Sequence, residues 1–253
     1  MATVKIRNII LGEGLPKIAV PNVGKTKAEI ITNAKEIVAA SPDLMEWRID
    51  YYTEGIEDNE QLVATAQQLR ELVGELPILV TFRTKNEGGV CDLAESAYLE
   101  LLQTIITNRL GDAVDIELFH NEKQIVELVE LAHKYNVVVI MSNHDFEKVP
   151  GQDVIEFRLN KMAQLGADVP KLACMPQTPQ DVLTLLAATT NVHDQLANPL
   201  ITMAMGDLGK VSRIAGQVFG SSLSFGAVGQ TSAPGQLSIV DLRNAEKYLQ
   251  MNS

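Results

Sequence analysis

The stretch Val169-Pro-Lys-Leu-Ala-Cys-Met-Pro176 is a short apolar run, bounded by prolines, that contains a single cation, Lys171. An apolar run of this length predicts a β-strand that is buried on both faces, as in a parallel sheet. A buried ammonium group costs several kcal/mol unless it is paired or loses its proton. A lysine without its proton is a nucleophilic amine, which imine-forming enzymes require. The stretch alone leaves three interpretations open: a catalytic lysine, an edge lysine that reaches solvent, and a structural ion pair; the rest of the chain favours the first.

Apolar, β-branched runs recur along the chain at intervals of roughly 30 residues, which is the length of one strand–helix unit. The runs begin at about Ile18, Leu44, Ile78, Ala113, Val137, Val169, Leu200 and Leu223. The segments between them have the periodicity of amphipathic helices; Ile30, Ala34 and Ile37, for example, mark one apolar face. The pattern predicts that strands and helices alternate along the chain.

Two of the predicted helices begin with capping residues. Thr26 precedes Glu29 by three residues, which is the spacing of a capping box. Thr178 is followed by Pro179, a residue favoured at the first helical position, and by Asp181 in the first turn. Both sites lie where the periodicity changes, which supports the predicted boundaries.

Eight strands that alternate with helices in 253 residues predict an α/β fold, and specifically a (β/α)8 TIM barrel. An open, doubly wound sheet is the alternative, but the glycine-rich dinucleotide fingerprint is missing after the first strand. Residues 4–14 resemble an extra strand and turn, so we expect an N-terminal β-hairpin that closes the bottom of the barrel. The chain has no low-complexity stretch, linker or charge block, so residues 1–253 are predicted to form a single domain.

The composition argues against several classes of function. The formal charge of −11 disfavours nucleic acid and anionic membranes as partners, although clustered arginines can still bind a small anionic substrate. No run of about 18 apolar residues occurs, and the N-terminus lacks the apolar stretch of a signal peptide. The only cysteines, Cys91 and Cys174, do not have the spacing of metal ligands. These features predict a cytoplasmic protein without disulfides, in a reducing compartment.

In a (β/α)8 barrel, chemistry takes place at the carboxyl ends of the strands and in the loops that follow them. Ionisable residues occupy these positions in most of the predicted strands. They are Glu46, Arg48, Arg83, Asp115, Glu117, His144, Lys171 and Arg213, and the last loop adds Ser232 and Gln236. Three arginines beside a lysine predict a site for an anionic carbonyl substrate.

Some of these residues also have a structural interpretation. Glu46 and Arg48 form a pattern that is often an internal ion pair, and His144 taken alone is more often a structural hydrogen-bonding residue than a base. The segment Gly206-Asp-Leu-Gly-Lys210 resembles a phosphate loop but lacks its spacing, so nucleotide binding is not predicted. Convergence at one barrel mouth favours a catalytic site, because a structural network seldom needs all of these cations.

Six segments, in order along the chain, carry a family resemblance. They are Glu46-Trp-Arg48-Ile-Asp50, Thr81-Phe-Arg-Thr-Lys-Asn-Glu87-Gly-Gly89, Ser142-Asn-His144-Asp-Phe-Glu-Lys148, Val169-Pro-Lys171-Leu-Ala-Cys-Met-Pro176, Met203-Ala-Met205 and Phe225-Gly-Ala-Val-Gly-Gln-Thr-Ser232-Ala-Pro-Gly-Gln236. The chain resembles type I 3-dehydroquinate dehydratase, a Schiff-base enzyme of the shikimate pathway. Each segment alone is a weak signal, but the ordered set is specific.

The resemblance implies a (β/α)8 barrel that forms a homodimer and needs no metal or organic cofactor, only a covalent imine. It implies a lyase that dehydrates 3-dehydroquinate, a small-molecule carboxylate, to 3-dehydroshikimate. By position, Lys171 would form the imine, His144 would be the general base and acid, and Glu87 would pair with that histidine. Glu46, Arg48, Arg83, Arg213, Ser232 and Gln236 would bind the substrate, with Arg213 on its carboxylate, and Met203, Met205, Phe225 and Ala233 would line the pocket.

One position departs from the family pattern. Some members of this family carry a serine that contacts the substrate at the end of the first strand, and this chain has Pro21 there. Position 21 is therefore left out of the predicted site. The departure affects one peripheral contact and leaves the chemistry unchanged.

Two other functions remain as alternatives. An imine-forming barrel aldolase would share Lys171 but would usually have a phosphate site after the seventh and eighth strands, where Gly226 and Gly229 resemble one. A catalytically silent barrel that binds a carboxylate for regulation or scaffolding would normally lack the nucleophile or the base, and this chain has both.

Overall fold

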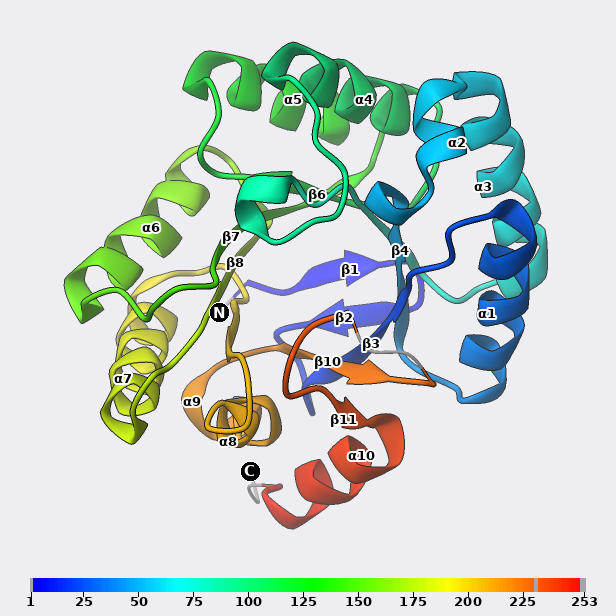
Figure 1. Cartoon of the computed structure of the whole chain (residues 1–253). Helices are drawn as coiled ribbons and strands as arrows, with labels where there is room; N and C mark the ends of the chain where they lie inside the picture. Colours follow the sequence, from blue (N-terminus) through cyan, green and yellow to red (C-terminus); the bar gives the residue numbers. More distant parts are fainter. Residues whose placement is uncertain (1, 230–231, 251–253) are drawn as a thin grey trace.

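The computed structural model describes residues 2–229 and 232–250, and its main sheet is a barrel of parallel strands surrounded by helices (Figure 1). The barrel strands are β3 (Lys17–Asn22), β4 (Leu44–Arg48), β5 (Ile78–Thr81), β6 (Ala113–Glu117), β7 (Val138–Asp145), β8 (Val169–Cys174), β9 (Ile201–Ala204) and β10 (Leu223–Ala227). A parallel bridge from Leu200 to Ser221 joins β9 to β10, and the Ser222 amide donates to the Leu200 carbonyl at 2.7 Å. The predicted (β/α)8 barrel is confirmed.

Helices follow the barrel strands and cover the outside of the sheet (Figure 1). They are α1 (Lys27–Ala39), α2 (Thr53–Glu57), α3 (Asn59–Val73), α4 (Glu95–Thr107), α5 (Glu122–Lys134), α6 (Gln152–Gln164), α7 (Pro179–Gln195), α8 (Lys210–Ile214), α9 (Gly216–Phe219) and α10 (Ile239–Tyr248). Two 3-10 turns, η1 (Ile49–Tyr51) and η2 (Lys85–Glu87), lead out of β4 and β5, and a short strand β11 (Leu237–Ser238) pairs with β10. Every predicted strand start agrees with the structure to within one residue.

The inner face of the barrel carries the residues of interest because successive side chains of a strand point to opposite faces. On β8, Leu172 and Cys174 pack into the outer core beneath the helices, whereas Val169 and Ala173 belong to a cluster inside the barrel. Lys171 lies between Val169 and Ala173 in this alternation, so its side chain enters the barrel. All six residues of β8 are buried, which confirms the predicted strand.

The bottom of the barrel is closed by the N-terminal hairpin. Strands β1 (Val4–Ile6) and β2 (Ile9–Leu11) pair in antiparallel fashion and lie across the barrel axis in Figure 1. Ile6, Ile9 and Leu11 are buried in one cluster with the first inward side chains of the barrel strands. The predicted hairpin is confirmed. Because apolar side chains fill this end, the polar interior groups gather at the other end.

The two predicted helix caps are present, but only one is a complete capping box. The Thr178 hydroxyl accepts the Asp181 amide, and the Asp181 carboxylate accepts the Thr178 amide at 2.9 Å. At α1, Thr26 accepts the Glu29 amide at 3.2 Å, whereas the Glu29 carboxylate accepts the amide of Lys25. At Thr26 the capping box is therefore incomplete, because the Glu29 carboxylate accepts the amide one residue before Thr26.

Over residues 2–229 and 232–250, every helix is too short or too polar to cross a bilayer. The same residues include no group of three or more His, Cys, Asp or Glu side chains that could hold a metal ion. The single domain over residues 1–253 and the cytoplasmic location stay predictions.

Glu246 on α10 is a buried acid with poor compensation. In the described part of the chain, neither of its carboxylate oxygens has a hydrogen-bond partner. The guanidinium of Arg243 lies 3.8 Å away but also pairs with Asp43 at 2.7 Å. Burial raises the pKa of Glu246 to about 7. The ionised carboxylate therefore opposes the packing of α10.

We expect Glu246→Gln to raise the free energy of unfolding by about 1–3 kcal/mol at about pH 8 and to change it little at about pH 4. Below the ordinary carboxyl pKa, both the folded and the unfolded state are protonated. Stability is then lost as the pH rises towards the folded-state value of about 7. Guanidinium denaturation followed by fluorescence of the single tryptophan, Trp47, measures the change. Glu130→Gln, at an exposed position on α5, is the control, and equal effects at both pH values would contradict the prediction.

Candidate active site

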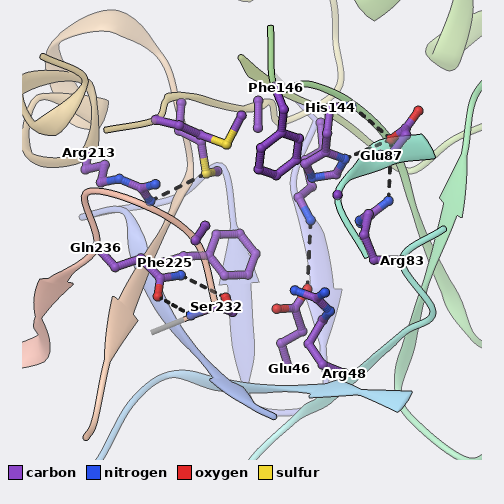
Figure 2. A pocket seen from close by; sticks show the side chains of 16 residues that line it. Glu46, Arg48, Arg83, Glu87, His144, Phe146, Arg213, Phe225, Ser232 and Gln236 are labelled. Carbon is purple, nitrogen blue, oxygen red and sulfur yellow. Dashed lines mark hydrogen bonds and ion pairs between the residues drawn. The ribbon is translucent and has the colours of Figure 1, made fainter. Parts of the chain in front are cut away.

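A pocket of about 490 Å³ opens at the carboxyl end of the barrel strands (Figure 2). Every residue predicted for the site lines this pocket: Glu46, Arg48, Arg83, Glu87, His144, Lys171, Met203, Met205, Arg213, Phe225, Ser232, Ala233 and Gln236. Three further lining residues, Gly88, Phe146 and Ala173, were not predicted. The structure thus gathers these side chains in one place, while their individual roles stay predictions.

Lys171 is buried in the pocket, with 3% of its surface exposed. Its Nζ lies 3.0 Å from Asp115 Oδ2 on β6 and 3.9 Å from Glu46 Oε1 on β4. The ammonium group also lies 4.8 Å from the centroid of the Phe225 ring. The edge position considered from the sequence is excluded, because β8 pairs with both β7 and β9. The predicted ion pair exists, since Lys171 contacts Asp115, but it lies inside the pocket and therefore does not exclude a catalytic role for Lys171.

A network of charges inside the barrel centres on Asp115. Arg83 Nη2 contacts Asp115 Oδ2 at 2.8 Å, and Arg83 Nη1 contacts Glu117 Oε1 at 2.7 Å. The Ser142 hydroxyl donates to Asp115 Oδ1 at 2.6 Å. Burial opposes ionisation of Asp115, but attraction to Arg83 and Lys171 outweighs burial and lowers the pKa of Asp115 to about 2. Asp115 is therefore a fixed anion that holds two cations beside the pocket.

His144, at the end of β7, is paired with Glu87 on η2 (Figure 2). Its Nδ1 lies 2.9 Å from Glu87 Oε2, which also accepts the backbone N–H of His144 at 2.9 Å. Burial and the positive charges of Arg83 and Lys171 hold the pKa of His144 well below its usual value. Burial and repulsion from Glu117 raise the pKa of Glu87 to about 8. The imidazole is therefore neutral, and its carboxyl partner titrates near neutral pH.

The three pocket arginines differ in how their charge is compensated. Arg48 makes two hydrogen bonds to Asp50, at 2.7 and 2.8 Å, and Arg83 is held by the Asp115 network. Arg213 forms no ion pair within residues 2–229 and 232–250; its Nη2 donates to the Pro234 carbonyl at 3.2 Å, and its buried Nε has no partner. Burial lowers the pKa of Arg213 to about 10. This guanidinium is well suited to bind an external anion (Figure 2).

The loop after β10 brings Ser232 and Gln236 to the side of the pocket where Arg213 lies (Figure 2). Gln236 Nε2 donates to the Ser232 hydroxyl at 3.0 Å, and its Oε1 accepts the Ser232 amide at 2.9 Å. Gly235, at φ +76°, lies so close to the Gly206 backbone that a Cβ would be 2.2 Å from the Gly206 carbonyl oxygen. The glycine therefore lets the two loops meet. Residues 230–231, part of the quoted family segment, lie outside the described residues.

Sequence reasoning missed some of the residues that organise this site. Asp115 was noted on its strand but was not assigned to the site, although it is the partner of both Lys171 and Arg83. Its signal was its spacing of two residues from Glu117, which places both carboxylates on one strand face. Phe146 was also missed, since nothing in the sequence separates a pocket phenylalanine from a packed one. Pro21 does not line the pocket.

Comparisons with known proteins agree with this geometry. The profile of the type I 3-dehydroquinase family matches residues 18–253. The chain belongs to the type I 3-dehydroquinase family. Its relatives include the 3-dehydroquinate dehydratase of Lactiplantibacillus plantarum, 49% identical over 249 residues and 98% of each chain. The corresponding protein of Klebsiella pneumoniae is 50% identical over 247 residues, which cover 97% of this chain and 98% of that one.

Solved structures place the chain in the same family. The type I 3-dehydroquinate dehydratase of Clostridium difficile, crystallised with covalent modified comenic acid, has a TM-score of 0.93 and 43% identity over 98% of this chain and 97% of that one. The 3-dehydroquinate dehydratase of Geobacillus kaustophilus has a TM-score of 0.96 and 39% identity, covering 100% of this chain and 98% of that one. The type I 3-dehydroquinase resemblance predicted from six sequence segments is therefore confirmed.

We expect Asp115→Asn to lower the free energy of unfolding by about 3–5 kcal/mol, because it leaves the buried charges of Lys171 and Arg83 without their shared counterion. Denaturation at neutral pH, followed by Trp47 fluorescence, measures the loss. Asp207→Asn is the matched control, since Asp207 pairs with Lys210 at the surface and the change should stay within about 1 kcal/mol. Similar losses in the two variants would show that Asp115 carries no special part of the stability.

Proposed function

We propose that this chain is a lyase that dehydrates 3-dehydroquinate to 3-dehydroshikimate through an imine on Lys171. One observation carries the proposal: a buried lysine, a neutral histidine and an arginine that has no ion pair among the described residues share one pocket. Each has a distinct task in the dehydration of an anionic β-hydroxy ketone. Membership of the type I 3-dehydroquinase family supports the same substrate.

The first step is formation of the imine. The Lys171 ammonium gives up a proton, its amine attacks the C3 ketone, and water leaves to give a protonated imine. The nearby carboxylates of Asp115 and Glu46, 3.0 and 3.9 Å from Nζ, are placed to accompany the cation that the imine keeps. The protonated imine is an electron sink, which makes the C2 proton acidic enough for a weak base.

The second step is elimination. His144 Nε2 takes the C2 proton, and the electron pair moves into the imine to give an enamine. The imidazolium then protonates the C1 hydroxyl as it leaves as water, and a further water hydrolyses the imine and frees Lys171. Glu87 Oε2 lies 2.9 Å from Nδ1, and when Glu87 is ionised it accepts a hydrogen bond from an Nδ1–H, so the neutral ring presents its unprotonated Nε2 as a base. General acid–base help of this kind is typically worth about 10²–10⁴-fold.

Substrate binding divides between one strong anchor and several polar contacts. Arg213 binds the carboxylate, since it is a buried guanidinium with no ion pair among the described residues and its Nε–H has no acceptor there. Ser232, Gln236 and Glu46 bind hydroxyl groups. Arg48 and Arg83, whose donors are largely taken by protein carboxylates, add positive potential to the site.

The wider proposals follow from the family. The reaction uses no metal or organic cofactor, because the imine supplies the electron sink. The protein acts as a homodimer in the cytoplasm, on a small-molecule substrate. The covalent modification in the Clostridium difficile relative supports a site that forms a bond to its ligand.

Borohydride reduction in the presence of 3-dehydroquinate tests the imine. We expect a stable adduct on the peptide that contains Lys171, and we expect Lys171→Ala to lose both the adduct and nearly all turnover. His144→Ala should still form the adduct while its kcat falls by at least about 10²-fold. Intact-mass and peptide mass spectrometry read the adduct. No adduct on folded wild-type protein, or normal turnover by Lys171→Ala, would reject the mechanism; phosphorylated sugars serve as control substrates for the aldolase alternative.

Arg213→Leu should raise the KM for 3-dehydroquinate by about a hundredfold while the empty protein keeps or gains stability, because the change removes a buried charge that has no carboxylate partner among the described residues. Arg213→Lys should lie between this variant and the wild type, since lysine keeps the charge but loses the planar fork. Steady-state kinetics and denaturation measure the two effects. Lys123→Leu, at a surface pair on α5, is the control. An unchanged KM would remove Arg213 from the carboxylate site.

A further inference from the structure

Asn143 lies next to His144 on β7, and the proposed reaction gives it no task. Its side chain is buried, and its Nδ2 donates to Glu87 Oε1 at 2.9 Å. Glu87 Oε1 thus accepts the Asn143 amide, while Oε2 accepts the backbone N–H of His144 and lies 2.9 Å from its Nδ1. These three contacts hold the carboxyl group in one orientation.

Arg158, on helix α6, fixes which way the Asn143 amide faces. Its Nη1 donates to Asn143 Oδ1 at 2.8 Å, and its guanidinium lies 5.2 Å from the centroid of the Phe119 ring. The oxygen and nitrogen ends of an amide have nearly the same shape, so shape alone does not choose between them. A guanidinium can only donate. Arg158 therefore requires the oxygen of Asn143, which leaves the NH2 group for Glu87.

The orientation of Glu87 determines the state of the catalytic histidine. An ionised Glu87 accepts the proton on His144 Nδ1, and this tautomer leaves Nε2 without a proton. If Asn143 turned its oxygen towards Glu87, two acceptors would face each other, and the carboxyl group would keep its proton. A protonated Glu87 can donate to Nδ1, which places the ring proton on Nε2 and removes the base.

We propose that Arg158 and Asn143 are positioning residues. Arg158 on helix α6 orients Asn143, and Asn143 holds the Glu87 carboxylate in the orientation in which it orients His144. This inference rests on the proposed dehydration, in which His144 is the base. Neither residue lines the substrate pocket, so both act through Glu87.

The charges around the Glu87–His144 pair set the direction of the expected effect. The surrounding groups are Arg83 after β5, Asp115 and Glu117 on β6, Lys171 on β8, Arg48 on β4 and Arg158 on α6. Burial and Glu117 already raise the pKa of Glu87, and the Asn143 hydrogen bond opposes that rise. Loss of this bond raises the pKa of Glu87 further. The base form of the pair then appears only at higher pH.

The test compares Arg158→Met, which keeps a long apolar stem, with Lys161→Met as the matched control on the same helix. Lys161 pairs with Glu122 at 2.8 Å away from the site. We expect Arg158→Met to lower kcat about tenfold, to leave KM within about twofold, and to shift the acid limb of the kcat profile upwards by at least about half a pH unit. Arg158→Lys should restore most of the loss, because lysine is also only a donor. Borohydride trapping on Lys171 should match the wild type.

A purely structural role for Arg158 predicts lower stability with an unchanged pH profile. An Arg158→Met protein with the pH profile and kcat of Lys161→Met would therefore overturn the proposal. If Arg158→Met did not fold, Asn143→Ser would take its place, with the same expected shift and the same overturning result.

A second readout separates this inference from the proposed function. ¹⁵N NMR of the four histidines reports the ring tautomer without any turnover, and His144→Ala assigns the signal. Above the pKa of Glu87, which is about 8, we expect His144 to carry its proton on Nδ1 in the wild type, whereas in Arg158→Met the proton should exchange between Nδ1 and Nε2. The same tautomer in both proteins would overturn the positioning role. Wild-type protein without turnover or adduct would reject the dehydratase proposal alone.

Discussion

The polar half of the barrel depends on the buried carboxylate of Asp115. One of its oxygens lies 3.0 Å from Lys171 Nζ and 2.8 Å from Arg83 Nη2, and the other accepts the Ser142 hydroxyl at 2.6 Å. This single anion joins four neighbouring strands through the barrel interior, where the loss of hydration is most expensive. Two cations can therefore be kept at one wall of a pocket. The same arrangement positions the amine that the proposed chemistry uses.

The pocket arginines differ in whether a protein carboxylate neutralises them, and this difference favours one orientation of an anionic ligand. Arg48 and Arg83 are held by protein carboxylates, while Arg213 on the other side forms no ion pair within the described residues. A substrate carboxylate gains most where no protein anion among the described residues competes, so in the proposed reaction Arg213 orients the ligand. In that proposal Lys171 and His144 face the ketone and the carbon next to it.

Much of the fold followed from the sequence because the pattern that encodes it is local. The apolar run around Lys171, the spacing of the eight strand starts and the cap at Thr178 depend on residues that are near neighbours in the chain. The Asp115–Lys171 pair spans 56 positions, so no local pattern reveals it. The same holds for Arg158, which reaches Glu87 only through Asn143 on a different element.

The sequence by itself determined the order of strands and helices, the family and the residues at the carboxyl ends of the strands. It did so because hydrophobic periodicity and motif order are properties of the linear chain. Only the tertiary structure decided which cation is paired with which anion, since closure of the barrel brings β4, β6 and β8 within ion-pair distance. Burial then sets the energy of each charge, and burial exists only in the folded state. For this reason three arginines that look alike in the sequence differ in burial energy and in carboxylate partners once they lie in the site.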